Sequence, residues 1–205
     1  MKKTLFILLM LSFVITTSCK KDKKETEVIT EETVNESQNT TPTANKVNPN
    51  KSKGEIKKIK VALESKSGST VTGNAVFTEE NGVVSMVILL EGLTEGTHAI
   101  HLHEKADCSA ADGTSSGGHW NPTAQPHGQW GSAEGYHKGD IGNIVANANG
   151  RATKSFSTDQ WCIGCGDAEL DIVGKAIIVH ESTDDFKTQP TGNAGGRVSC
   201  GGIIQ

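Results

Sequence analysis

Three of the seven histidines in this 205-residue chain lie in one short stretch that is rich in glycine and proline. The stretch, GGHWNPTAQPHGQWGSAEGYHKGD, spaces His119, His127, His137 and Asp140 as H-x7-H-x9-H-x2-D. Three imidazoles and one carboxylate suit zinc, and four ligands complete its tetrahedral shell. If His119 belongs to that set, the stretch closes a zinc site unaided, and metal ligation rather than a hydrophobic core supplies its folding energy.

Two more histidines, His101 and His103, stand two residues apart in the segment GTHAIHLHE, which is an expected strand. Side chains at positions i and i+2 of a strand leave the same face, so both imidazoles can reach one metal ion. The H-x-H spacing alone is weak evidence, because a partly exposed strand face carries such a pair by chance. His180 ends a second expected strand, AIIVH, and is a further candidate ligand.

Short strands are the elements that would position these groups. In TVTGNAVF, residues Val71, Gly73, Ala75 and Phe77 fall on one side, and ENG at 80–82 is a hairpin turn signal. The other expected strands are IKVAL, VVSMVILLEGL, GTHAIHLHE, the two arms of IGNIVANANGRATKSF around its NANG turn, and VGKAIIVHE. This pattern favours an antiparallel sandwich or barrel. Two insertions, roughly 104–140 and 181–196, are too long for hairpins, and loops of that length usually have a function.

The composition fits an all-β protein and argues against a nucleic-acid-binding protein. Hydrophobic residues make up 35% of the chain and aromatic residues only 4%, so the core must be mainly aliphatic, and the 23 glycines indicate many turns. The net charge of -4, without a basic stripe, argues against nucleic-acid binding. From Glu55 onward the chain carries 11 Lys or Arg against 18 Asp or Glu, which is a formal net charge near −7.

The N-terminus is typical of a targeting segment. Lys2 and Lys3 precede an apolar run that is too short for a comfortable membrane span, and small residues then lead to Cys19. This pattern resembles a bacterial lipoprotein signal, which predicts a signal peptide over 1–19 that ends at a lipidated Cys19. Residues 20–54 contain no aromatic and few aliphatic side chains, so we expect a disordered tether there, followed by one folded domain over 55–205.

The chain has five cysteines, an odd number. If Cys19 carries lipid, four remain, and they allow three pairings. Two of them form the C-x-x-C pair Cys162 and Cys165 in WCIGCG. Such a pair is interpreted here as a local structural disulfide, with a redox pair and half of a soft metal site as the alternatives.

Several motifs in their order along residues 57–205 resemble the copper/zinc superoxide dismutase family. They are HAIHLHE, Cys108, GGHWNP, PHG, HKGDIGN, VGKAIIVHE, DD and TGNAGGRVSCG. The resemblance implies an all-β fold, an eight-stranded antiparallel Greek-key sandwich or flattened barrel with two long functional loops. It also implies one copper and one zinc ion per subunit, and superoxide as the small-molecule substrate.

The resemblance also assigns ligands. His101, His103, His119 and His180 are the implied copper ligands, and His119, His127, His137 and Asp140 are the implied zinc ligands, so His119 bridges the two metals. Imidazole suits both metals, and a copper site without thiolate does not lock the ion as Cu(I). By the same resemblance, His119 releases copper on reduction, takes a proton and hands it on at reoxidation. His98 matches no ligand and is interpreted as a hydrogen-bonded structural histidine.

Further roles are implied around these ligands. Arg197 matches the family's active-site arginine, Thr191 the small residue that narrows the channel, and Asp184 the carboxylate that links a copper ligand to a zinc ligand, with Asp185 as its adjacent alternative. Cys108 and Cys200 match the intrasubunit disulfide. The 181–196 loop is short, so the steering charges of longer forms are not carried over, and the role of its Lys187 stays open. Arg151 is expected to be a surface charge.

The function implied is dismutation of superoxide to O2 and H2O2 at a histidine-bridged copper/zinc site, protecting the cell envelope from extracytoplasmic superoxide. The alternative is a copper- and zinc-binding envelope lipoprotein without turnover. A lipid anchor at Cys19 would hold the protein to a membrane, on the periplasmic side of the outer membrane or at the cell surface. Monomers and homodimers are both compatible with the resemblance.

Overall fold

The computed structural model describes residues 55–205, and the signal peptide and tether expected over 1–54 lie outside that range. These described residues form one eight-stranded antiparallel sheet in the order β5-β4-β7-β8-β1-β2-β3-β6. Its strands are β1 (Lys57–Ser65), β2 (Thr72–Glu80), β3 (Val83–Glu91), β4 (Gly96–His103), β5 (Asp140–Ala146), β6 (Ala152–Thr158), β7 (Ala176–His180) and β8 (Arg197–Gly202). Over the same residues, no helix has the length and apolar character needed to cross a membrane.

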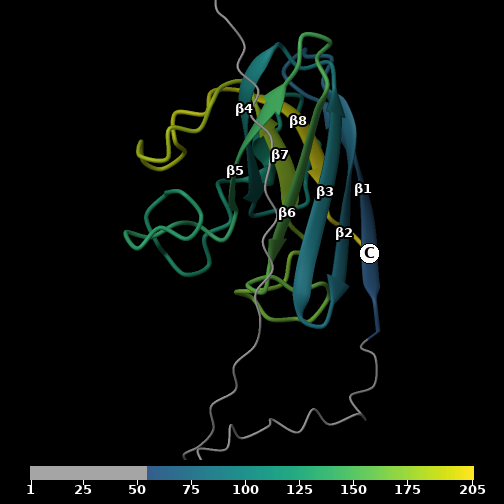
Figure 1. Cartoon of the computed structure of the whole chain (residues 1–205), viewed down its shortest axis with the longest axis vertical. Helices are drawn as coiled ribbons and strands as arrows, with labels where there is room; N and C mark the ends of the chain where they lie inside the picture. The colour runs from purple at the N-terminus through teal and green to yellow at the C-terminus, as the bar shows by residue number, and fades with distance from the viewer. Residues whose placement is uncertain (1–54) are drawn as a thin grey trace, which may run out of the picture. The chain divides into compact units, whose positions relative to one another are not determined.

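The sheet curls into a nearly closed barrel (Figure 1). Its two edge strands, β5 and β6, are joined by the expected NANG hairpin, where the Asn147 N–H donates to the Arg151 carbonyl at 3.0 Å. Lys154 Nζ on β6 also donates to the Asn143 carbonyl on β5 at 2.9 Å. The expected all-β antiparallel class with eight strands is therefore confirmed.

Alternation of side chains builds the core. Every second residue of β3 is buried, and Phe77 on β2 and Met86 on β3 are fully inaccessible to solvent. The β2–β3 hairpin turns at Asn81 and Gly82, whose φ angles of 54° and 79° are the left-handed values that such a turn requires. The core is mostly aliphatic, as the composition suggests, with Phe77, Trp120 and Trp161 as its buried aromatic side chains.

Two strands are shorter than the sequence suggests. The apolar run after the first hairpin ends as a strand at Glu91, because Gly92 takes a φ of 82° and turns the chain. The strand expected over 173–181 begins only at Ala176, since Gly174 has a φ of 86°. Both glycines mark strand ends that alternation alone does not reveal.

The two long insertions project from the same side of the barrel (Figure 1). The first joins β4 to β5 and contains one short 3-10 helix, Thr114–Ser116, and the second joins β7 to β8. The first loop returns to β4, where Trp120 N–H donates to the Leu102 carbonyl at 2.8 Å and Leu102 N–H donates to the Gly139 carbonyl at 2.9 Å. Both loops therefore start and end beside the histidine-bearing strands.

Candidate metal centre

Four buried histidines meet at the ends of β4 and β7. His101 and His103 come from β4, His180 is the last residue of the neighbouring β7, and His119 comes from the first long loop. Nitrogen atoms of all four lie within 4.8 Å of one another, and His103 Nε2 is 3.3 Å from His180 Nε2. We call these four residues the strand cluster, because backbone ladders hold three of them.

A second group, the loop cluster, consists of His119, His127, His137 and Asp140, and its potential ligand atoms also lie within 4.8 Å of one another. Asp140 Oδ1 is 3.0 Å from His119 Nδ1 and 3.2 Å from His137 Nδ1. Its Oδ2 is 3.0 Å from His127 Nδ1 and accepts the His137 N–H at 2.8 Å. Asp140 is fully buried and is the hub of this cluster.

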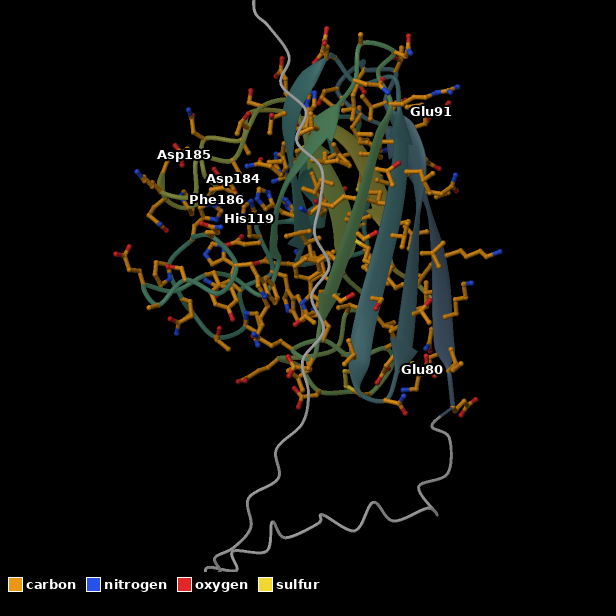
Figure 2. The ribbon with its side chains drawn as sticks, viewed as in Figure 1. Glu80, Glu91, His119, Asp184, Asp185 and Phe186 are labelled. Carbon is orange, nitrogen blue, oxygen red and sulfur yellow. A yellow bond between two sulfur atoms is a disulfide. The ribbon has the colours of Figure 1, made fainter. Side chains whose placement is uncertain are left out.

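His119, labelled in Figure 2, belongs to both clusters by the distances between potential ligand atoms. Its backbone forms an antiparallel bridge with His103, which brings the loop against β4. Its Nδ1 faces Asp140 in the loop cluster, and its ring centroid lies 3.9 Å from that of His101 in the strand cluster. The single imidazole thus stands between the two groups of potential ligands.

Asp184 joins the clusters a second time. Its Oδ2 is 2.9 Å from His101 Nε2, and its Oδ1 is 2.8 Å from His127 Nε2. The neighbouring Asp185 is exposed and accepts hydrogen bonds from the N–H groups of Lys187 and Thr188, which closes a local turn. The distances therefore place Asp184, and not Asp185, between the two rings. In Figure 2, Asp184 is labelled nearer the barrel and Asp185 farther out.

Burial keeps the strand cluster neutral. Desolvation lowers the pKa of His119 to about 4, and it holds the pKa values of His103 and His180 well below the ordinary value of 6.5. Desolvation also lowers the pKa of His101, although Asp184 acts in the opposite direction. Neutral imidazoles carry the free lone pairs that metal binding requires.

The loop cluster is charged instead. Burial acts to raise the pKa of Asp140, but hydrogen bonds from three histidines outweigh it and hold that pKa below the ordinary range. Burial likewise acts to lower the pKa of His127, yet hydrogen bonds and charges from Asp140 and Asp184 raise it to about 9. Without a metal, this cluster is neutralised by a proton on His127.

Buried histidine nitrogens without hydrogen bonds show that the two clusters suit metal ions. Among residues 55–205, the buried side-chain nitrogens and oxygens without a hydrogen bond of good geometry are His101 Nδ1, His119 Nε2 and His127 Nδ1, the last of which has the Asp140 carboxylate 3.0 Å away. A buried polar atom left without a partner costs about 1–3 kcal/mol, so such atoms are rare in folded proteins. Each of these nitrogens belongs to one of the two clusters, where a metal ion would satisfy it.

Comparison with known proteins decides the family. A model of the copper/zinc superoxide dismutases matches residues 71–203. The chain belongs to the copper/zinc superoxide dismutase family. It is accordingly an oxidoreductase that acts on superoxide, with copper and zinc as its cofactors, as the motifs suggested.

Individual relatives agree with this assignment. The chain is 40% identical over 141 residues to an extracellular Cu-Zn superoxide dismutase of Drosophila melanogaster, covering 65% of this chain and 75% of that one. It is 42% identical over 135 residues to a Cu-Zn superoxide dismutase of Caulobacter vibrioides, covering 64% of this chain and 77% of that one.

Solved structures share the fold. A double mutant of a SOD-like protein from Bacillus subtilis is 32% identical, with a TM-score of 0.63, and covers 71% of this chain and 97% of that one. The clock protein EA4 is 33% identical, with a TM-score of 0.62, and covers 72% of this chain and 94% of that one.

Arg197 stands beside the strand cluster, since it pairs with His180 across β7 and β8. Its Nη1 donates to the Gly113 carbonyl at 2.8 Å and to Ser116 Oγ at 3.0 Å. The first long loop therefore fixes the position of its guanidinium group. Thr191 is half-buried in the second loop, where its carbonyl accepts the Ala194 N–H at 3.4 Å.

The structure joins four cysteines of the dismutase in two disulfides. Cys108 pairs with Cys200, which ties the first long loop to β8 across a separation of 92 residues, and Cys162 pairs with Cys165 in the connection between β6 and β7. Cys19 lies outside the described residues. His98 is 3% exposed, and its ring nitrogens lie 3.0 Å from the His180 carbonyl and 2.9 Å from the Thr94 carbonyl.

Several supporting residues escaped the sequence analysis. The Asn143 side chain exchanges two hydrogen bonds with the backbone of Asp184, and the Gln189 side chain does the same with the backbone of His127. Trp161 Nε1 donates to the carbonyl of Lys138 at 2.9 Å, next to His137. No periodic pattern in the sequence reveals these contacts. The one available signal was that the first long loop has no strand pattern and so must be held by contacts from other segments.

Proposed function

We propose that the strand cluster is the copper site, that the loop cluster is the zinc site, and that His119 is the ligand they share. The observation that carries this proposal is the position of His119, with Nδ1 on Asp140 and a buried, partnerless Nε2 on the side of the strand cluster. Bound copper supplies the electron exchange with superoxide, while bound zinc has no redox chemistry and supplies charge and a fixed geometry.

The chain's own groups then divide the remaining work. Asp184 orients the rings of His101 and His127 by accepting from one nitrogen of each, which leaves the opposite nitrogen of each ring free for a metal. His119 holds a proton at Nε2 between the two half-reactions and gives it up to the peroxide product. Nε2 is the atom suited to this role, because Nδ1 faces Asp140 in the loop cluster and Nε2 has no other hydrogen-bond partner.

Arg197 binds the substrate anion. The domain is acidic by about seven charges, so its net charge cannot attract superoxide, and a local positive group must guide the anion. Arg197 sits across from His180 with Nη1 anchored to the first loop, which leaves its other N–H groups available to an anion near the strand cluster. Thr191 is the proposed residue that narrows the channel.

A neutral substitution of this arginine tests the proposed site. We expect Arg197→Gln to lower kcat/KM for superoxide about 10-fold, or ~1.4 kcal/mol, with copper and zinc content unchanged. Arg151→Gln is the matched control, because Arg151 is exposed and pairs only with Glu91 at 3.4 Å. Equal rates in both variants would remove Arg197 from the proposed mechanism.

The location of the enzyme is the second part of the proposal. A lipid on Cys19 and the tether over 20–54 would hold the domain at the cell envelope, where it removes extracytoplasmic superoxide. The described domain contains two disulfides, and disulfides persist in oxidising compartments. Radiolabelled palmitate should enter the wild-type chain in its bacterial host and be absent from Cys19→Ala, whereas equal labelling of both would contradict lipidation at Cys19.

A further inference from the structure

Cys162 and Cys165 belong to neither metal cluster, and nothing in the proposed dismutation uses them. They lie in the connection 159–175 between β6 and β7, at the lower end of the barrel in Figure 1. Cys162 is 8% exposed, whereas Cys165 is an exposed residue, so solvent reaches the pair from the side of Cys165. An accessible sulfur is the first requirement for thiol exchange or metal binding.

The backbone around this pair is held by contacts that do not involve sulfur. Asp171 Oδ1 accepts the N–H groups of Gly164 and Val173 at 2.9 and 3.0 Å, and its Oδ2 accepts the Gly166 N–H at 2.8 Å. The two glycines flank Cys165. None of these hydrogen bonds depends on the disulfide, so we expect the turn to keep its shape and the two sulfur atoms to stay near each other when the disulfide opens.

Ile163, between the cysteines, anchors the turn to the barrel. Its side chain is 1% exposed and packs in the core. Its N–H donates to Glu79 Oε2 at 2.8 Å, and its carbonyl accepts from Lys57 Nζ at 2.7 Å. Because Lys57 and Glu79 belong to β1 and β2, the pair is carried on the rigid barrel and not on a free loop.

The donor atoms of the open pair select the ion. The two sulfurs and a carboxylate oxygen of Asp171 lie within 4.8 Å of one another, and that carboxylate already accepts three backbone N–H groups. Structural zinc takes four ligands, which this group does not offer. Paired thiolates without further ligands suit the soft ion Cu(I).

We propose that Cys162 and Cys165 form a redox-controlled Cu(I) site, which binds one Cu(I) ion as a dithiol and none as a disulfide. An external dithiol opens the pair by giving two electrons and two protons to the disulfide, and is itself oxidised to a disulfide. Cu(I) then displaces the two thiol protons. Closure uses hydrogen peroxide, and this oxidant is supplied by the proposed function: the two thiolates lose two electrons, the peroxide takes up two protons and leaves as two waters, and Cu(I) departs unchanged.

The test counts copper on enzyme whose histidine clusters already hold copper and zinc. This enzyme is reduced with a dithiol, desalted without oxygen and titrated with Cu(I) against bicinchoninate, while alkylation and mass spectrometry verify that Cys162 and Cys165 have opened. We expect one further Cu(I) ion per chain, with copper–sulfur scattering in X-ray absorption, since neither histidine cluster contains sulfur. Unreduced enzyme should take none, and hydrogen peroxide should release the ion.

The Cys162→Ser/Cys165→Ser variant is the matched control, and it should bind no further copper while its superoxide turnover is unchanged. Reduced wild-type enzyme without copper–sulfur scattering would overturn the proposal, as would an extra ion that persists in the double variant or a reduced site that prefers Zn²⁺. Loss of dismutase activity in fully loaded enzyme would count against the proposed function alone, because added hydrogen peroxide still tests this site.

Discussion

The strand cluster and the loop cluster share His119 but are built in different ways. The ladder between β4 and β7 fixes His101 and His103, and the ladder between β7 and β8 fixes His180, so their backbones cannot separate unless strands part. His127 and His137 stand in a long loop and meet through one carboxylate, that of Asp140. The backbone builds the first cluster, and charge and ligation build the second.

This difference has a thermodynamic consequence. The strand cluster is buried and neutral, and strand ladders around an aliphatic core hold it. In the loop cluster, the buried carboxylate of Asp140 needs a cation for compensation, which is either a proton on His127 or a metal ion. On the proposed assignment, zinc therefore stabilises the fold of the loop, whereas copper binds to histidines that the strand ladders already position.

Removal of Asp140 should have the largest effect on this contrast. We expect Asp140→Ala to weaken zinc binding about 100-fold or more and to lower the free energy of unfolding of the zinc-loaded protein by about 5 kcal/mol. The strand cluster should still bind one copper ion. Metal analysis and thermal unfolding check both expectations, with exposed Asp185→Ala as the control. Equal loss of copper and zinc would mean that the clusters are not built separately.

Loss of the long-range disulfide should come next. The Cys108–Cys200 bridge spans 92 residues, and bridges that close long loops contribute about 4 kcal/mol. We expect Cys108→Ser/Cys200→Ser to lose that amount in denaturant unfolding. Superoxide turnover should also fall, because the loop that holds Arg197 through Gly113 and Ser116 is released. Unchanged turnover would show that strand β8 alone positions Arg197.

In the metal-free protein, the two clusters should respond to pH in opposite directions: one should lose stability as the pH rises and the other as it falls. The pKa of His127 is raised to about 9, so its contribution to stability is complete below its ordinary value of 6.5 and is lost as the pH rises to 9. The pKa of His119 is lowered to about 4, so stability is lost as the pH falls from 6.5 to 4. We expect a bell-shaped Tm profile.

Zinc should flatten the basic limb of that profile, because it replaces the proton on His127. Across this basic limb, we expect the free energy of unfolding to fall by about 2 kcal/mol, a value reduced from the full pKa shift to allow for solvent screening. Scanning calorimetry between pH 4 and 9, with and without zinc, measures both limbs. A basic limb that is the same with zinc would argue against His127 as a zinc ligand.

The smallest expected effect concerns a clamp on the loop cluster alone. The Gln189 side chain accepts the His127 N–H and donates to the His127 carbonyl, both at 2.8 Å. We expect Gln189→Ala to cost about 1 kcal/mol of stability and to weaken zinc binding about 10-fold, with copper binding unchanged. Gln125→Ala is the control, since Gln125 is an exposed glutamine on the first long loop, which carries His127. A matching loss of copper affinity would contradict the separation.

The sequence allowed most of the barrel and the types of ligand to be predicted. Alternation of apolar residues located the strands, but strand ends set by Gly92 and Gly174 were missed because a positive φ leaves no periodic signal. The spacing of the histidines pointed to metal chemistry, and the family resemblance divided them into two sets.

What could not be predicted depends on contacts between distant segments. Asp184 and Asp185 are adjacent and chemically alike, and only the folded loop turns one inward. Asn143 and Gln189 support Asp184 and His127 from segments 41 and 62 residues away. Such hydrogen bonds between distant segments depend on tertiary packing, which leaves no periodic pattern in a single sequence.

Superoxide turnover at known metal occupancy tests the central claim most directly. Enzyme with one zinc ion per chain is loaded with increasing copper, and the initial rate of superoxide loss is measured against the copper bound. The expected result is a rate proportional to copper in the strand cluster, reaching its maximum at one ion per chain. Full occupancy of both clusters without superoxide-dependent turnover would contradict the account and leave a metal-binding protein.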